Sequence, residues 1–359
     1  MSLLYRTVLD VLHRTRIARA SRGACQGAGV VFMLHRVLPR AEDRREDGKA
    51  CRFSPNGGLA ITPAFLDAAI ALVKSQGFEL IPLRDVPARL AAARGGERQR
   101  PFACFTLDDG YRDNREHAWP VFRRHDAPFT IFVAPAYADG ESELWWEVLE
   151  EVIRHHDEVH TCGLPDMPAV LHTRSAAGKQ AAWDALYPII RYMDEFQQRD
   201  FILHFAKRHG LDAHEQCRRL IMNWNELREM AADPLCSIGA HTMHHRALAR
   251  LDEEEARYEM AASRARLEEE LGQPARTLAY PYGDPDSAGP REFRLARELG
   301  FEVALTTRKG HLFPEHAEHL TALPRLSLNG YYQHVRYLDV LLSGLPFWLY
   351  NRFHRLNVA

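Results

Sequence analysis

The 359-residue sequence is poor in cysteine and in long apolar runs. Its six cysteines are scattered, and no two have the C-x-x-C spacing of a zinc ribbon or a thioredoxin-type redox motif. Sparse, irregular cysteine in a large chain is typical of reduced proteins, so we expect a cytoplasmic location. Apolar runs are only a few residues long, and none could cross a bilayer. The N-terminus lacks the apolar core of a signal peptide, because Arg6, His13 and Arg14 interrupt it.

An excess of charge of one sign is also absent. Lys and Arg number 46 and Asp and Glu 48, which gives a formal net charge of −2. A charge balance this close to neutrality gives no reason to expect nucleic acid as the partner, and we expect none. Hydrophobic residues make up 46% and charged residues 26%, which excludes a wholly disordered chain.

Strand and helix patterns alternate along most of the chain. Thr62 and Pro63, for example, are residue types preferred at the N-cap and first position of a helix. This alternation predicts a parallel sheet of about seven or eight strands, which fits either an open doubly wound sheet or a closed barrel. Strands are expected over residues 29–34, 78–81, 102–107, 129–133, 236–239, 276–280 and 301–305, and helices over residues 63–76, 112–125, 252–271 and 291–299.

One long segment, residues 141–225, interrupts this alternation. It is rich in Leu, Arg, Glu and His at helical spacing, and we expect a helical insertion without strands. Its Trp145–Trp146 pair is either a sugar-stacking platform or the packing face of a helix, and we favour packing. The chain then divides into an N-terminal basic amphipathic segment (1–28), a main domain (29–330) and a C-terminal helical tail (331–359).

Two motifs at the ends of expected strands carry candidate metal ligands. Asp108 and Asp109 stand in the run Thr-Leu-Asp-Asp-Gly. Two adjacent carboxylates repel each other, and a bound cation would hold both ionised. His241 and His245 are four residues apart, so on one turn of helix they would point the same way and share a metal.

A third motif, Ala-Tyr-Pro-Tyr-Gly at residues 279–283, follows another expected strand. Such a turn can direct backbone N–H groups into a site. Each motif alone has an ordinary structural explanation. Together, Asp109, His241 and His245 supply the carboxylate and two imidazoles of a catalytic zinc site with an open position, and Asp108 is a natural general base beside it.

The three motifs, in this order, resemble those of the polysaccharide deacetylases, the NodB-homology group of carbohydrate esterases. The resemblance covers about residues 30–328, apart from the insertion. It implies a distorted (β/α) barrel, so that with the insertion inferred above we expect an α/β fold, a barrel of about seven strands with a helical insertion. It also implies metal-dependent removal of an N-acetyl group, less often an O-acetyl group, from a sugar.

By family role, Asp108 would be the catalytic base. Asp109, His241 and His245 would hold a divalent metal, which we expect to be zinc, although cobalt, nickel or iron would suit the same ligands. The backbone N–H of Tyr282 would help to bind the oxyanion.

The sequence departs from the family pattern in two places. Ala279 stands where many members have an arginine that orients the catalytic aspartate, and we take Arg325 as the candidate to supply that charge. The late leucine-rich motif, at residues 338–343, lacks the usual general-acid histidine. His35, in the run Leu-His-Arg-Val, resembles the N-terminal acid histidine of circularly permuted members that act on poly-N-acetylglucosamine. The resemblance therefore implies that His35 is the general acid.

The expected partner is an acetylated glycan or a lipid-linked saccharide, and no protein partner is predicted. One alternative is a catalytically inactive barrel that only binds glycan. The other is a metal-dependent glycosyltransferase, which would have no use for His241 and His245 and would need a phosphate-binding glycine-rich loop that the sequence lacks.

The two ends of the chain are basic and apolar. Residues 1–40 hold seven arginines and one acid, Asp10. We expect a helix there whose apolar face holds chiefly Leu3, Leu4, Val8 and Leu12, with Leu9 and Val11 less regularly placed. The C-terminal stretch adds Leu345, Phe347, Trp348, Leu349, Tyr350 and Phe353, with Arg352 and Arg355. These helices either pack on the barrel and on each other, which we favour, or contact the inner membrane face peripherally.

Overall fold

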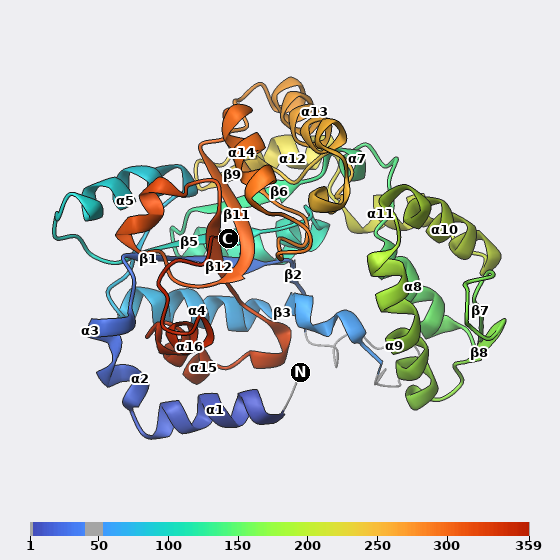
Figure 1. Ribbon diagram of the computed structural model, residues 1–359, viewed down its shortest axis with the longest axis horizontal. Helices are drawn as coiled ribbons and strands as arrows, with labels where there is room; N and C mark the ends of the chain where they lie inside the picture. The colour runs from blue at the N-terminus through green and yellow to red at the C-terminus, as the bar shows by residue number, and fades with distance from the viewer. Residues whose placement is uncertain (1–2, 40–52, 359) are drawn as a thin grey trace.

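The computed structural model describes residues 3–39 and 53–358 (Figure 1). Its centre is a closed ring of seven parallel strands, in which β1 pairs with both β12 and β5. The predicted barrel is thus confirmed, and the open sheet is excluded. In order round the ring the strands are β1 (Gly29–Leu34), β12 (Leu323–Ser327), β11 (Val303–Lys309), β10 (Thr277–Ala279), β9 (Cys236–Ala240), β6 (Phe129–Val133) and β5 (Phe102–Leu107).

The barrel strands are apolar because both of their faces are covered. β5 and β6 are buried along their whole length, as is usual for parallel strands with side chains packed inside and helices outside. Phe32 and Phe105 stack with ring centroids 4.8 Å apart. An eighth strand, β4 (Glu79–Leu80), pairs with the first residues of β5, and β2 (Arg36–Val37) pairs with β3 (Ala60–Ile61) outside the ring.

Helices surround the barrel, and their ends follow local sequence signals. The hydroxyl of Thr62 accepts a hydrogen bond from the backbone N–H of Phe65, with Pro63 at the first helical position, as predicted. The helix expected over 112–125 is present at residues 112–124, and it contains a π-helical stretch (Asn114–Ala118). The surrounding helices are α4 (Pro63–Ser75), α5 (Val86–Arg94), α6 (Trp119–Arg124), α7 (Pro135–Ala138), α12 (Trp224–Ala231), α13 (Glu253–Leu271) and α14 (Pro290–Glu298).

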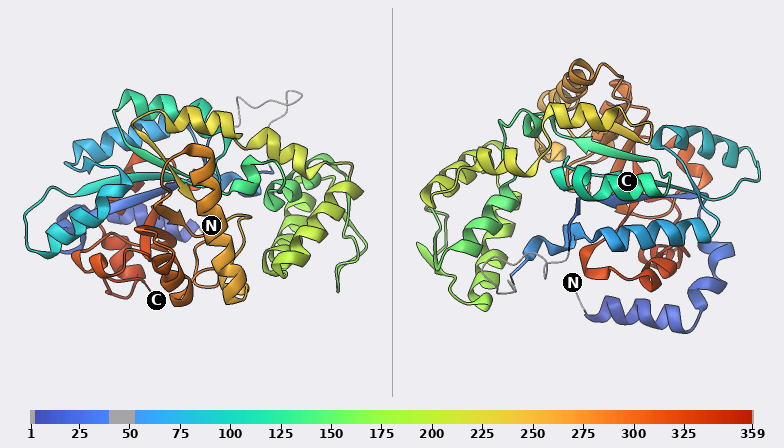
Figure 2. Two further views of the ribbon diagram at one scale, coloured as in Figure 1. Left: turned by 90° about the horizontal axis from the view of Figure 1, so that it is seen from above. Right: turned by 180° about the vertical axis from the view of Figure 1, so that it is seen from behind.

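The insertion stands to one side of the barrel in both views of Figure 2. Its helices are α8 (Trp145–His155), α9 (Ala176–Tyr192), α10 (Glu195–Arg208) and α11 (Ala213–Leu220). The expectation that it has no strands is wrong, because β7 (Glu158–His160) and β8 (Val170–His172) form an antiparallel pair. Strands of three residues carry too little period-two alternation to be recognised in a sequence.

The two ends of the chain meet on the barrel's outer side. α1 (Leu3–Arg14) packs on α15 (Val335–Leu341), and α16 (Leu345–Tyr350) contacts α3 (Arg22–Cys25), which follows α2 (Ile17–Ala20). The predicted apolar face of the first helix is partly wrong, since Leu9 is fully buried whereas Val8 is 44% exposed. The position of α15 decides which side of α1 is buried, and Leu9 lies on that side. The periodicity of α1 alone does not reveal where α15 packs.

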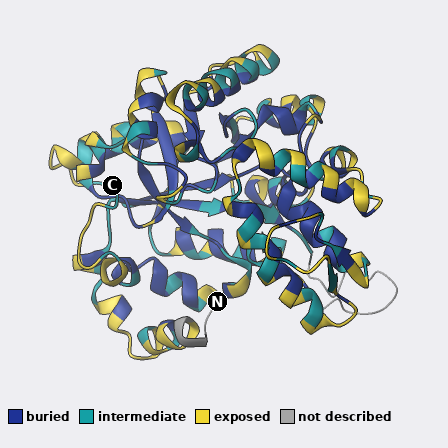
Figure 3. Cartoon of the chain, turned by 45° about the vertical axis from the view of Figure 1, so that its right-hand side comes forward, coloured by how far each residue is buried: buried dark blue, intermediate teal, exposed yellow. Residues whose placement is uncertain are grey.

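Burial is concentrated in the barrel, where the strands are dark blue in Figure 3, whereas the outer faces of the helices are exposed. Among the described residues, no helix combines the length and apolar character needed to cross a membrane.

Candidate active site

The candidate residues gather at one end of the barrel because each follows, or lies in, a parallel strand. Asp108 and Asp109 follow β5, His241 follows β9, and His35 follows β1. The carboxyl ends of parallel barrel strands meet on one face, where barrel enzymes build their sites. Pairing of β1 with β5 places Leu34 opposite Leu107, so the segments carrying His35 and Asp108 leave the barrel side by side.

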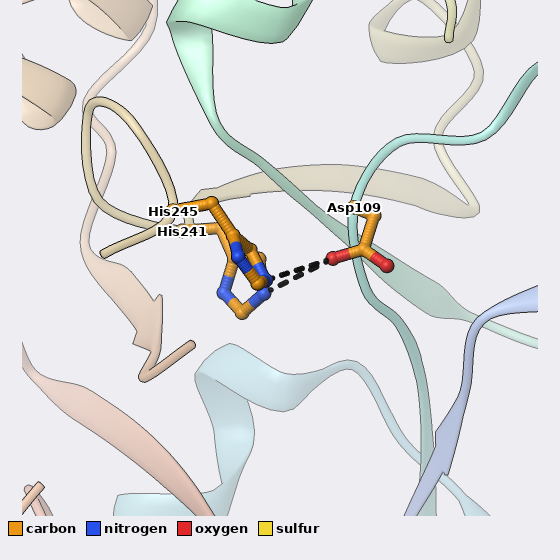
Figure 4. Close-up of side chains that lie close together, drawn as sticks. All are labelled: Asp109, His241 and His245. Atoms are coloured by element: carbon orange, nitrogen blue, oxygen red, sulfur yellow. Dashed lines mark ion pairs between the residues drawn. The ribbon is translucent and has the colours of Figure 1, made fainter. Parts of the chain in front are cut away.

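Asp109, His241 and His245 form a compact cluster (Figure 4). The Nε2 atoms of His241 and His245 lie 3.4 and 3.3 Å from Oδ1 of Asp109. All three side chains are buried, and one ligand atom from each lies within 4.8 Å of the others. These are the three residues that the sequence analysis proposed as metal ligands, and the structure places them side by side.

The predicted reason for the histidine pairing is wrong, because residues 241–245 do not form a helical turn. They form a loop in which Thr242 and His245 have φ angles of 57° and 59°. Non-glycine residues seldom adopt this left-handed conformation. The loop, and not a spacing of four on a helix, turns both rings toward Asp109.

The chemistry of this cluster fits a divalent cation. Oδ1 of Asp109 is buried and receives no hydrogen bond from any residue in the described part of the chain. The Nδ1–H of His241 donates to the carbonyl oxygen of Ala279 at 2.6 Å. Because a carbonyl only accepts, His241 must hold its proton on Nδ1, which leaves the Nε2 lone pair facing Asp109. One carboxylate and two imidazoles are a donor set that suits a zinc-class cation and leaves a coordination position open.

Burial acts on the ionisation of the cluster. It lowers the pKa of His245, although Asp109 opposes this effect, and so favours the neutral ring that can bind a metal. Burial alone would raise the pKa of Asp109, but the imidazoles of His241 and His245 beside its carboxylate hold this pKa well below its usual range.

Arg325 lies against Asp108, as anticipated from the sequence. Its two terminal nitrogens donate to Oδ1 and Oδ2 of Asp108 at 2.7 and 2.8 Å, and its Nε donates to the carbonyl of Thr306 at 2.9 Å. Burial would raise the pKa of Asp108, but Arg325 and, less strongly, the nearby histidines bring it below its usual value. Asp108 is therefore ionised at neutral pH.

His35 approaches the same carboxylate from β1. Its Nε2 lies 3.9 Å from Oδ2 of Asp108, and its side chain is 20% exposed. The amide of Asn114 donates to the carbonyl of His35 at 2.8 Å and fixes the backbone there. Arg36, the next residue, donates to Asp113 at 2.9 Å and to Glu147 of the insertion at 3.1 Å.

Tyr282 sits in a strained turn after β10. Tyr282 and Gly283 both have φ angles of 60°, and a Cβ on Gly283 would lie 2.6 Å from the backbone nitrogen of Thr307, so only glycine fits. The hydroxyl of Thr307 donates to the carbonyl of Tyr282 at 2.6 Å. Within residues 3–39 and 53–358, the backbone N–H of Tyr282 donates no hydrogen bond.

The insertion contributes residues that the sequence analysis did not assign to the site. Trp145 donates through Nε1 to the hydroxyl of Tyr282 at 2.8 Å, and the ring of Trp146 lies 5.0 Å from that of His245. Both tryptophans are buried, which agrees with the favoured packing interpretation. Arg191 of α9 lies 3.6 Å from the centroid of the Tyr282 ring. Nothing in the sequence around Arg191 marks it as part of this site.

Known structures that share the fold include the following three. Deacetylase PplD of Streptococcus pyogenes, solved with acetate, is 15% identical, with a TM-score of 0.54 over 87% of this chain and 97% of that one. IcaB of Ammonifex degensii is 19% identical, with a TM-score of 0.53 over 89% and 97%. A de-N-acetylase of Aggregatibacter actinomycetemcomitans is 12% identical, with a TM-score of 0.53 over 87% and 99%. A search of curated protein sequences finds no match.

The sequence itself identifies the family more directly than these distant structures do. The family model for polysaccharide deacetylase matches residues 95–191 and 197–304, which is more than half of the chain. The match includes Asp108, Asp109, His241, His245 and Tyr282. This chain belongs to the polysaccharide deacetylase family.

Proposed function

We propose that the protein is a metal-dependent hydrolase that removes the N-acetyl group from an amino sugar of a polysaccharide or glycan precursor. The observation that carries the proposal is the meeting of two units at one barrel end. One is the cluster of Asp109, His241 and His245, whose donor atoms could hold a metal ion, and the other is the Asp108–Arg325 pair. A divalent cation held by the cluster would supply a Lewis acid and a water of lowered pKa.

Asp108 accepts the proton of the attacking water. Arg325 occupies one lone pair on each oxygen of this carboxylate, so the remaining lone pairs keep a fixed direction. The bidentate pair also keeps Asp108 ionised, which a base requires before it can act.

The remaining groups act on the acetyl carbonyl and the leaving nitrogen. As water adds to the carbonyl carbon, the N–H of Tyr282 stabilises the developing oxyanion. His35 donates a proton to the amide nitrogen as the carbon–nitrogen bond breaks, because an amine anion is a very poor leaving group. The products are acetate and a free amino sugar.

Acetate release tests this proposal. Purified protein is incubated with oligomers of N-acetylglucosamine and with O-acetylated sugars, after chelation and after return of Zn²⁺, Co²⁺ or Ni²⁺. We expect release from the N-acetylated oligomers that disappears on chelation and returns with metal. Glycan binding without acetate release under every metal would instead indicate an inactive binding barrel. Hydrolysis or transfer from a nucleotide-sugar would indicate the glycosyltransferase.

The location of the protein is a separate proposal, namely peripheral contact with an anionic membrane surface. No acidic residue occurs between Asp10 and Glu42 or after Asp339, and contact between α3 and α16 brings these two acid-free segments together. Within the described chain, no ion pair involves Arg16, Arg19 or other exposed arginines of these segments (Arg14 and Arg352). Exposed aromatic and basic side chains together favour a membrane interface.

Vesicle binding tests this second proposal. We expect sedimentation with phosphatidylcholine vesicles that contain phosphatidylglycerol, weakening with salt and with the double change Arg16→Gln and Arg19→Gln. If the full chain does not bind such vesicles at low salt, the exposed arginines contact only solvent and the proposed membrane contact is wrong.

A further inference from the structure

A cavity of about 290 Å³ lies outside the barrel, between β12 and the helices α4, α15 and α16, which lie together in Figure 1. Its wall is mostly apolar and includes Phe65 of α4, Leu338 and Leu341 of α15, and Phe347 of α16. The volume is near the lower end of the range of about 300–1,000 Å³ typical of small-molecule sites. Well-packed interiors leave few voids larger than one water, so a space of this size is a candidate binding site.

The cavity is separate from the candidate active site. Arg325 and Leu326 are neighbours in β12, and successive side chains of a strand point to opposite faces. Arg325 reaches Asp108 inside the barrel, whereas Leu326 lines the cavity outside it. An occupant of the cavity is therefore divided from the catalytic groups by the strand itself.

The mouth of the cavity carries a positive charge. Lys309 lines it and is exposed, and its Nζ lies 5.0 Å from the ring centroid of Tyr350, which is 64% exposed. Lys309 forms no ion pair in the described part of the chain, and no acidic residue is among those lining the cavity. An apolar space with a lone cation at its mouth matches an amphipathic anion.

The surface around the cavity further restricts the class of molecule that could occupy it. The next exposed side chains on α16 are Trp348 and Leu349, 36% and 47% exposed, and this is the face proposed above to contact a membrane. The chain itself offers no apolar segment for the cavity from residues 40–52, which lie outside the described residues and are mostly charged.

We infer that the cavity holds one hydrocarbon chain of an anionic lipid, with the lipid phosphate at Lys309. The inference rests on the proposed membrane contact for its source of lipid, and it adds a site that is distinct from the catalytic one. Burying the alkyl chain supplies the driving force, and the ammonium of Lys309 selects the negative headgroup.

Titration with dioctanoylphosphatidylglycerol below its critical micelle concentration tests the site without a bilayer. We expect saturable binding of one lipid to the full chain. Leu341→Trp fills the cavity and should weaken binding at least tenfold. Leu349→Trp places the same side chain on the exposed part of α16 and should leave binding unchanged. Circular dichroism compares the folding of the two variants.

A variant that removes the charge of Lys309 tests recognition of the lipid headgroup independently of the apolar cavity wall. Lys309→Gln should weaken binding about fivefold, whereas Lys207→Gln, on the exposed side of α10, should not. Absence of saturable binding to the wild-type chain, or equal binding by Leu341→Trp, overturns the inference. Adsorption to anionic vesicles without binding of the monomeric lipid would leave the membrane contact standing and still overturn the cavity site. Acetate release, measured separately, reports on the proposed function.

Discussion

Arg325 and Asp108 face each other as a bidentate pair that is almost wholly buried, with exposures of 1% and 2%. Arg325 comes from β12 and Asp108 from the end of β5, and β1 lies between these two strands in the ring. The guanidinium thus reaches across the barrel interior, from a strand other than the one that ends in Ala279. A buried carboxylate so paired remains charged and cannot rotate, which are the two properties a positioned base needs.

Asp108→Asn should retain metal and lose turnover. The change removes the base but none of the atoms in the ligand cluster, and general-base steps contribute about 10²–10⁴-fold. Metal analysis and acetate release on the same sample measure both quantities. Asp109→Asn is the matched control, because it should lose metal and activity together, as should His241→Ala and His245→Ala. Near wild-type turnover in Asp108→Asn would contradict the role of base.

Arg325→Lys should keep the charge but not the geometry. A single ammonium cannot donate two parallel hydrogen bonds to the carboxylate, so we expect kcat to fall about 10- to 100-fold with metal content unchanged. Arg325→Ala would leave a buried carboxylate unpaired and should cost about 3–5 kcal/mol of stability. Arg297→Lys, on the exposed side of α14, is the control. A drop in metal content in Arg325→Lys would show that Arg325 supports the ligand cluster instead of the base.

His35→Ala should lower turnover on an N-acetyl sugar by about 10²–10⁴-fold without loss of metal. An acetyl ester with a phenolate leaving group needs no proton at that step, so its hydrolysis should fall much less. The comparison of the two substrates separates loss of the general acid from general damage to the site. A loss below about threefold on the amide would exclude His35 as the acid.

Arg191→Lys should lower kcat about tenfold with little change in KM. Arg191 stacks on Tyr282 and donates to the hydroxyl of Ser287 at 2.7 Å, so it holds the strained turn from the side of the insertion. Lysine retains the charge but loses the planar stacking surface. Removal of one oxyanion donor lowers kcat about 10²–10³-fold. A more mobile turn at Tyr282 misplaces this donor without removing it, so we expect a smaller fall in kcat. Arg208→Lys, at the exposed end of α10, should have no effect. An unchanged kcat would show that the stacking of Arg191 on Tyr282 only stabilises the packing of the insertion against the barrel.

Glu143 should make the protein less stable as pH rises. Burial raises its pKa to about 7, although Arg199 and Arg246 oppose the shift. The folded state therefore holds a proton that the unfolded state releases near pH 4.5, and stability falls between about pH 4.5 and 7. At 1.36 kcal/mol per pH unit the loss is about 3 kcal/mol.

Glu143→Gln should flatten this dependence, and thermal unfolding measured from pH 5 to pH 8 reports it. The exposed neighbour Glu141→Gln should keep the wild-type slope. A parallel decline in the Glu143→Gln variant would assign the pH dependence to other groups.

Local sequence determined most of the barrel strands and the chemical groups of the site, whereas β12, which carries Arg325, was not among the expected strands. β1, β5 and β6 begin and end at the predicted residues, because each is a compact apolar run bounded by polar or turn residues. Asp109, His241 and His245 were recognisable because the residues that follow parallel strands share one end of the barrel. One carboxylate and two imidazoles indicate metal binding by residue type alone, independently of the backbone conformation that connects them.

Only the tertiary structure decided closure of the barrel, the loop that carries the histidines and the place of Arg191. Closure depends on pairing β1 with β5, two strands separated by about seventy residues, and no periodicity within either strand encodes that partner. His241 and His245 converge through left-handed backbone angles, which the surrounding packing imposes against the residues' own preference. Arg191 belongs to the site because α9 lies against the turn at Tyr282. Such contacts between distant segments follow from how whole elements pack, so they cannot be predicted from the local sequence around the residues that make them.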